Sequence, residues 1–242
     1  MSASPNQATL RLSGLAAVVS FTFIGLLLLP AEASAQCENW TQRNPLNAPS
    51  GRYQVAMAYD SARGVTVLFG GWSVSARLNN DTWEWDGTNW TQRTPTTVPP
   101  PRYAHAMAYD SARGVTVLFG GWIGGTTGYS DTWEWNGSNW TQRTPATAPA
   151  ARMGHAMAYD STRGVTVLFG GAFDEQAGGT YGDIWEWDGT NWTQRTPLMA
   201  PSTRSHSGGA YDSGRGVTVL FGGTDGGNRK GETWPKLLSY EA

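Results

Sequence analysis

Two histidines occupy equivalent places in a repeated sequence and are the first candidates for chemistry. His105 and His155 each stand third after an arginine, where two other copies of the repeat have Val55 and Ser207. Imidazole nitrogens bind transition metals, and two such side chains on neighbouring strands could approach one ion. Metal sites usually need three or four ligands, and no carboxylate recurs beside these histidines. We therefore expect no metal and no cofactor at this pair.

A glutamate recurs between two tryptophans in three copies of the repeat. Alternation along a strand places this carboxylate on the face opposite the indoles, and a buried carboxylate needs a cationic partner. That partner is either the first arginine of each copy or the arginine of the later Arg-Gly pair. A structural ion pair is the expected role, and the alternative is that the first arginines line a channel and bind an anionic ligand. The glutamates are Glu84, Glu134 and Glu186, and the first arginines are Arg52, Arg102, Arg152 and Arg204.

The elements that must position these side chains follow from the repeat itself. Successive first arginines are 50, 50 and 52 residues apart. In the second copy, four short runs at 103–110, 114–121, 131–137 and 139–145 alternate or cluster apolar residues between turn residues, as β-strands do. Asp110 and Gly114 between the first two runs predict a hairpin turn. The Gly-Gly pair that closes the second run lets the backbone leave the sheet without a Cβ clash.

The repeated motifs resemble those of the kelch family. Each hydrophobic run ends in Gly-Gly, and an aromatic–Asp or aromatic–Asn pair and then a further tryptophan follow it. These motifs are Trp85-Asp86 before Trp90, Trp135-Asn136 before Trp140, and Trp187-Asp188 before Trp192. The resemblance covers residues 39–234 and implies an all-β β-propeller built of four-stranded antiparallel blades, like the central domain of galactose oxidase. It implies no particular function, because kelch propellers serve as binding scaffolds, structural parts and enzymes.

The strand count predicts four blades, at 52–93, 102–143, 152–195 and 204–234. The fourth blade lacks a fourth run, because Pro235 stops its third one. The segment NWTQR at 39–43 has the sequence of a fourth strand, and we expect it to complete the last blade and close a four-bladed ring. The alternative is an open array that is a fragment or self-associates. Residues 235–242 match no part of the repeat and are expected to form a tail.

The first 35 residues have the pattern of a secretory signal peptide. An apolar run at 15–29 ends at Pro30, and Ala33 and Ala35 fit the small-residue positions of a cleavage site. Cleavage would leave the propeller at 36–234 secreted or periplasmic and free of the membrane; the alternative is an uncleaved anchor. Cys37 is the only cysteine, so it cannot form an internal disulfide, and its role stays open. A net charge of −2 gives no footprint for nucleic acid.

Recognition is expected in the loops that differ between copies. Antiparallel order places the loops between the second and third strands (2–3 loops) and the linkers between blades (4–1 linkers) at one end of the sheets, here called face A. The 2–3 loops, at 72–80, 122–130, 172–182 and 224–231, are unlike one another, and varied loops on a rigid scaffold often bind ligands. Their aromatic side chains suit stacking on sugars or contact with a protein. They are Trp72, Trp122, Tyr129, Phe173 and Tyr181.

These features favour an exported, non-catalytic scaffold that binds a protein or a glycan through face A. One alternative is a copper enzyme resembling galactose oxidase, in which tyrosine and histidine would hold copper beside a Tyr–Cys cross-link. Cys37 precedes the first blade and belongs to no inner strand, which disfavours that alternative. The other alternative is a degenerate array without independent activity. No Ser-His-Asp arrangement with an elbow motif occurs, and we do not expect an enzyme.

Overall fold

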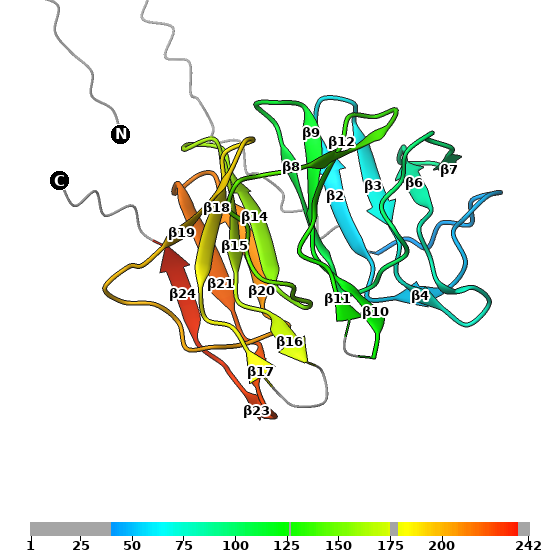
Figure 1. Ribbon diagram of the computed structural model, residues 1–242. Helices are drawn as coiled ribbons and strands as arrows, with labels where there is room; N and C mark the ends of the chain where they lie inside the picture. Colours follow the sequence, from blue (N-terminus) through cyan, green and yellow to red (C-terminus); the bar gives the residue numbers. More distant parts are fainter. Residues whose placement is uncertain (1–39, 126, 175–178, 237–242) are drawn as a thin grey trace, which may run out of the picture. The chain divides into compact units, whose positions relative to one another are not determined.

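The computed structural model describes residues 40–125, 127–174 and 179–236, which form strands and no helix (Figure 1). Two compact units divide the chain, residues 1–42 and 43–242. The predicted signal peptide, its cleavage site and Cys37 lie outside the described residues, as do residues 237–242 of the predicted tail. Within the described ranges, no helix is long and apolar enough to span a membrane.

Four large antiparallel sheets follow one another along the described chain. Sheet 1 has the spatial order β2 (Ala56–Asp60), β3 (Val65–Phe69), β6 (Thr82–Trp85) and β7 (Trp90–Arg93). Sheet 2 repeats this order with β8 (Ala106–Asp110), β9 (Val115–Phe119), β12 (Thr132–Trp135) and β13 (Trp140–Arg143). Sheet 3 does so with β14 (Ala156–Asp160), β15 (Val165–Phe169), β18 (Ile184–Trp187) and β19 (Trp192–Arg195). Sheet 4 contains β20 (Gly208–Asp212), β21 (Val217–Phe221) and β24 (Thr233–Lys236).

Each 2–3 loop forms a small hairpin of its own. The hairpins are β4 (Trp72–Ser73) with β5 (Arg77–Leu78), β10 (Trp122–Gly124) with β11 (Thr127–Gly128), β16 (Ala172–Asp174) with β17 (Gly179–Thr180), and β22 (Thr224–Asp225) with β23 (Asn228–Arg229). The first of them also pairs with β1 (Arg52–Tyr53). Residues 126 and 175–178 of the predicted loops lie outside the described residues.

The predicted turn between the first two strands is confirmed. In sheet 2, the Asp110 carboxylate accepts hydrogen bonds from the backbone N–H groups of Ala112 and Arg113 at 3.1 and 3.0 Å. Gly114 has a φ of 66° and donates its N–H to the Asp110 carbonyl at 2.9 Å. Local hydrogen bonding by aspartate and the left-handed backbone of glycine therefore fix this turn.

The sheets pack face to face in chain order, with β8 against β2 and β14, and β14 against β20 (Figure 1). We call the face of a sheet that meets the preceding sheet its front, and the face that meets the following sheet its rear. Side chains alternate along β9: Leu118 packs at the front, whereas Val117 and Phe119 pack at the rear. Two tryptophans at the front of sheet 2, Trp135 and Trp140, fill its junction with sheet 1, and Trp187 and Trp192 do the same at the front of sheet 3.

The Gly-Gly pairs hold the junctions between consecutive sheets. Gly121 donates its N–H to the carbonyl of Arg152, the first arginine of the next copy, at 2.9 Å. A Cβ on Gly120 would stand 2.7 Å from the same oxygen, closer than real Cβ atoms approach. The Arg152 N–H in turn donates to the Tyr129 carbonyl of sheet 2's own loop at 3.3 Å. These glycines therefore allow the next copy of the repeat to approach the backbone directly, which goes beyond the predicted exit from the sheet.

The predicted closure of a ring is not found in the structure. Sheet 4 has three strands among the described residues, and β24 pairs there with β21. Residues 40–43, which the sequence predicts as a fourth strand, belong to no strand. The structure is therefore an all-β array of blade-like sheets without a closed sheet, because the two ends of the array do not pair.

Candidate functional site

The repeated glutamates are buried and accept hydrogen bonds from two cations each. Glu134 accepts from Arg113 of the Arg-Gly turn at 2.5 Å and from Arg143 of β13 at 2.7 Å. Trp187 of sheet 3 donates its Nε1–H to the same carboxylate at 3.1 Å across the junction. The turn arginine is thus the partner of the glutamate, which confirms one of the two pairings that the sequence left open. This cluster is structural, because its acceptors are taken by groups of the protein itself.

The first arginines do not pair with the glutamates, so the other predicted pairing is wrong. Arg102 is fully buried and forms a two-pronged ion pair with Asp131, with Nη–Oδ distances of 2.6 and 2.8 Å. Its Nη1 also donates to the Gly120 carbonyl at 2.8 Å. Arg52 and Arg152 form the same two-pronged pairs with Asp81 and Asp183. Arg204 bonds to Glu232 through one Nη alone, and its other Nη donates to the Ser202 hydroxyl. Burial and these bonds place the first arginines inside the scaffold, where they fix the start of each third strand.

Two of the aspartates in these pairs, Asp81 and Asp183, have lowered pKa values. Burial raises the pKa of Asp183, but hydrogen bonds from Arg152 and Trp185 outweigh it and bring the pKa below the ordinary range. The pKa of Asp81 is lowered in the same way by Arg52 and Trp83 against the opposing effect of burial. Asp81 and Asp183 are therefore ionised at neutral pH, and each is held by its arginine.

Two tyrosines of the 2–3 loops stack on these buried ion pairs. The Tyr129 ring lies over the Arg102 guanidinium at 4.1 Å, and the Tyr181 ring lies over Arg152 at the same distance. Cation–π contact of this kind holds a ring in one orientation. Tyr129 is thereby fixed at the end of its loop, directly before Ser130 and Asp131.

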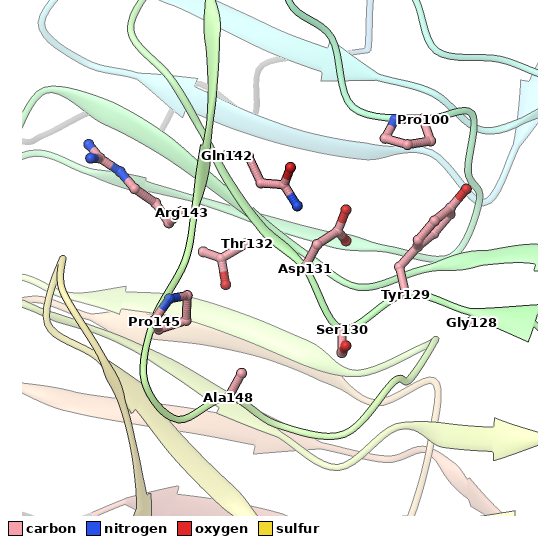
Figure 2. Close-up of a pocket in the computed structure, with 10 residues that line it drawn as sticks. All are labelled: Pro100, Gly128, Tyr129, Ser130, Asp131, Thr132, Gln142, Arg143, Pro145 and Ala148. Carbon is pink, nitrogen blue, oxygen red and sulfur yellow. The ribbon is translucent and has the colours of Figure 1, made fainter.

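One cavity on face A brings together a 2–3 loop and a 4–1 linker. It has a volume of about 560 Å³, and Figure 2 shows its lining residues. Tyr129, Ser130 and Asp131 come from the loop, Gln142 from β13, and Pro145 and Ala148 from the linker to sheet 3. The predicted meeting of these two kinds of segment at one end of the sheets is confirmed here. The walls offer an aromatic ring, a hydroxyl and an amide beside the Asp131 carboxylate, which is paired with Arg102; this set suits a polar ligand.

Of the five aromatic residues predicted for recognition, only Tyr129 lines this cavity. Trp122 is buried and donates its Nε1–H to the Gly125 carbonyl at 2.9 Å. Trp72 packs edge-on against Tyr103 of the next copy, with ring centroids 5.9 Å apart. Phe173 is exposed and packs against Tyr181 at 5.3 Å. The loop tryptophans therefore seal junctions between copies.

Sequence reasoning missed most of the cavity wall. Gln142 belongs to the WTQR run that recurs in every complete copy, and that invariance pointed to a structural role. The signal that could have found it is its position: the third residue of an outer strand, just before the linker that differs between copies. Pro145 and Ala148 are linker residues without chemistry of their own, and they shape the cavity only because the linker turns there.

The two histidines are buried at successive junctions. His105 packs edge-on against Phe69 of sheet 1, and His155 packs in the same way against Phe119 of sheet 2, each at 5.6 Å. Burial lowers the pKa of His155 to about 3, and burial likewise holds the pKa of His105 well below its ordinary value. Among the described residues, no group of three or more histidine, cysteine, aspartate or glutamate side chains is placed to hold a metal ion.

The low pKa of His155 predicts a loss of stability in mild acid. In the unfolded state the His155 imidazole has its ordinary pKa of 6.5 and binds a proton below that pH, whereas in the folded state it stays neutral. The free energy of unfolding therefore falls as pH decreases from 6.5 toward 3. The loss due to this one residue is about 2 kcal/mol at pH 5. Urea unfolding of the wild type and of His155→Val at pH 7 and pH 5 measures it, valine being the residue of the first copy at this place. An equal drop in both proteins would show that His155 is not buried neutral.

Comparison with protein-family models gives no match for this chain, and comparison with curated proteins gives none either. The fold therefore carries the classification by itself: an all-β protein of repeated antiparallel sheets, three of them four-stranded in the described residues.

Proposed function

We propose that this protein is an exported, non-catalytic scaffold of the kelch-like propeller type that binds its ligand on face A. The observation that carries the proposal is the cavity beside Tyr129, which lies where a variable 2–3 loop meets a 4–1 linker. Repeated, nearly identical strands hold these segments in place, while the 2–3 loops differ from copy to copy. That division of labour is common in repeat proteins that bind ligands.

The chemistry of the cavity favours a glycan as the ligand. A sugar ring has an apolar face that packs on aromatic rings and a rim of hydroxyls that need donors and acceptors. Tyr129 supplies the ring, and Ser130 and Gln142 supply a hydroxyl and an amide beside it. The neighbouring ion pair of Asp131 with Arg102 keeps this wall rigid, so little ordering is needed on binding.

The arrangement of buried charges supports a non-catalytic role over a hydrolytic one. Catalytic carboxylates need a free oxygen facing the substrate. Glu134 instead faces Arg113, Arg143 and an indole of the next sheet. Copper chemistry is the alternative from another class, and metal analysis of the purified protein tests it directly: stoichiometric copper would contradict the proposal.

Removing the amide of Gln142 tests the binding role. A glycan array identifies the ligand, and titration calorimetry then compares the wild type with Gln142→Ala. We expect binding about fivefold weaker, since one hydrogen bond to a neutral group is worth about 1 kcal/mol. The matched control is Gln92→Ala, which changes the same position of sheet 1 away from this cavity. Equal affinities of wild type, Gln142→Ala and Tyr129→Ala would remove the cavity from the proposal.

A further inference from the structure

The front of sheet 1 carries the residues of a junction, but no sheet among the described residues packs on it. Met57 is 54% exposed, whereas Met107 at the same place in sheet 2 is 7% exposed. Tyr53 and Tyr59 are likewise exposed, although Tyr103, the counterpart of Tyr53, is buried. Trp85 and Trp90 line a cavity of about 260 Å³ on this front, where sheet 2 buries the equivalent tryptophans against sheet 1.

The rear of sheet 4 is open in the corresponding way. Phe221 is 57% exposed, whereas Phe69 and Phe119 at the same place are fully buried. The space around the Gly-Gly pair of this sheet also shows that its rear is open. A Cβ on Gly222 would meet nothing closer than the Lys230 carbonyl at 3.6 Å. A Cβ on Gly170 would stand 2.5 Å from the Arg204 carbonyl of the next copy. The space beside Gly222 that the first arginine of a following copy would occupy is therefore free in sheet 4.

A ladder of backbone hydrogen bonds runs through the junctions and is extendable at both ends. Ala104 donates to the Gln54 carbonyl at 2.9 Å, Gly154 to Ala104 at 2.8 Å, and His206 to Gly154 at 2.6 Å. Gln54, Ala104 and His206 hold a left-handed backbone in order to do so, with φ from 53° to 57°. The ladder begins at the Gln54 N–H and ends at the His206 carbonyl, a donor and an acceptor that fit each other.

From these two open faces we infer that the protein associates head to tail with a second copy of itself, the front of sheet 1 packing on the rear of sheet 4. The internal junctions show which contacts such an interface makes. Gly223 would donate to the Arg52 carbonyl of the second copy, as Gly171 does to Arg204. Two copies that fill each other's faces close a dimer, and further copies could extend the array.

The side chains around the open faces are complementary. Tyr109 stands beside Asp60 of the preceding sheet, and burial together with that carboxylate raises the pKa of the tyrosine. Tyr59 at the front of sheet 1 is the counterpart of Tyr109, and Asp212 of sheet 4 is the counterpart of Asp60. Trp140 donates to Thr82 at 2.9 Å across the first junction, and Trp90 and Thr233 repeat these residue types. The bond from a tryptophan to the glutamate is lost, because Pro235 takes the place of the glutamate. The bonds from the linker to an asparagine of the next sheet, such as Thr96 to Asn139, also have no counterpart among the described residues of sheet 4, so this junction is weaker than the internal ones.

Size-exclusion chromatography with light scattering measures the molar mass of the purified protein and tests this inference. Protein concentrations from about 1 to 100 µM cover the range in which weak association appears. We expect at least twice the mass of one chain. Met57→Glu and Phe221→Glu each add a charge that an apolar junction would bury, and each should weaken association about 100-fold. Both positions are exposed in a single chain, so circular dichroism should show an unchanged fold. Leu198→Glu, at an exposed linker residue, is the control and should associate like the wild type.

Gly222→Ala gives an independent reading. Its Cβ fits within one chain but would occupy the space of the Arg52 carbonyl of the second copy, so we expect weaker association without a change of fold. Gly114→Ala, with a similar φ and nothing within 4 Å, should leave association intact. A monomer throughout the concentration range would overturn the inference, whether the faces are bare or covered by the chain's own N-terminal segment. An oligomer that persists in both charge variants would overturn it too.

Discussion

Replacing Gly120 with alanine is expected to destabilise the protein by about 3–5 kcal/mol. Alanine in the left-handed region costs about 1–2 kcal/mol by itself. The larger share comes from the new Cβ, which would lie 2.7 Å from the Arg152 carbonyl. That oxygen is backbone and accepts the Gly121 N–H, so relief of the clash requires sheet 3 to move and this hydrogen bond to break.

Gly114→Ala separates the backbone strain from the clash. Gly114 has a φ of 66° against 65° for Gly120, lies in the same copy of the repeat, and would gain a Cβ that meets nothing within 4 Å. Its substitution should cost only the conformational term, about 1–2 kcal/mol. Chemical denaturation of both variants at one pH gives the comparison. Equal losses of stability would show that the Gly-Gly pair serves conformation alone and that sheets 2 and 3 do not meet through it.

Much of this fold could be predicted from local patterns. The hairpin at Asp110 and Gly114 depends on residues within one turn, and the alternation of Val117, Leu118 and Phe119 depends on one strand. Such features repeat with the sequence and need no knowledge of neighbouring sheets. The closure of the array does need that knowledge, since it depends on the rotation from each sheet to the next. The similarity of residues 39–43 to a fourth strand says nothing about that rotation.

The partners of the buried charges and the residues of the candidate site were harder to predict, because they depend on contacts between segments far apart in the sequence. Both sets of arginines recur with the period of the glutamates, so spacing alone could not tell which one reaches Glu134. The structure separates them, because the Arg-Gly turn lies in the same sheet as the glutamate, whereas the first arginine lies at the base of a 2–3 loop. Trp122 was expected at a ligand, but a tryptophan directly after Gly-Gly lies at the junction and is buried there.

The same junctions predict a large effect of Arg152→Leu. Arg152 is fully buried and binds both oxygens of Asp183, at 2.6 and 2.8 Å, as well as the Gly170 and Ala150 carbonyls. Leucine fills part of the space but leaves the carboxylate with the Trp185 Nε1–H as its remaining described donor. Breaking a buried pair in this way costs about 3–5 kcal/mol. Urea unfolding at pH 7 is the measurement.

Arg204→Leu is the matched control, because its partner can be rehydrated. The Glu232 side chain is 53% exposed, whereas that of Asp183 is 19% exposed, so we expect Arg204→Leu to lower the free energy of unfolding clearly less than Arg152→Leu does. The pH dependence gives a second criterion. Without Arg152, burial raises the pKa of Asp183, so this carboxyl group takes up a proton at a higher pH than in the wild type and is then neutral. The cost of Arg152→Leu should therefore shrink between pH 7 and pH 4. A cost independent of pH would mean that Arg152 acts through packing and not through its charge.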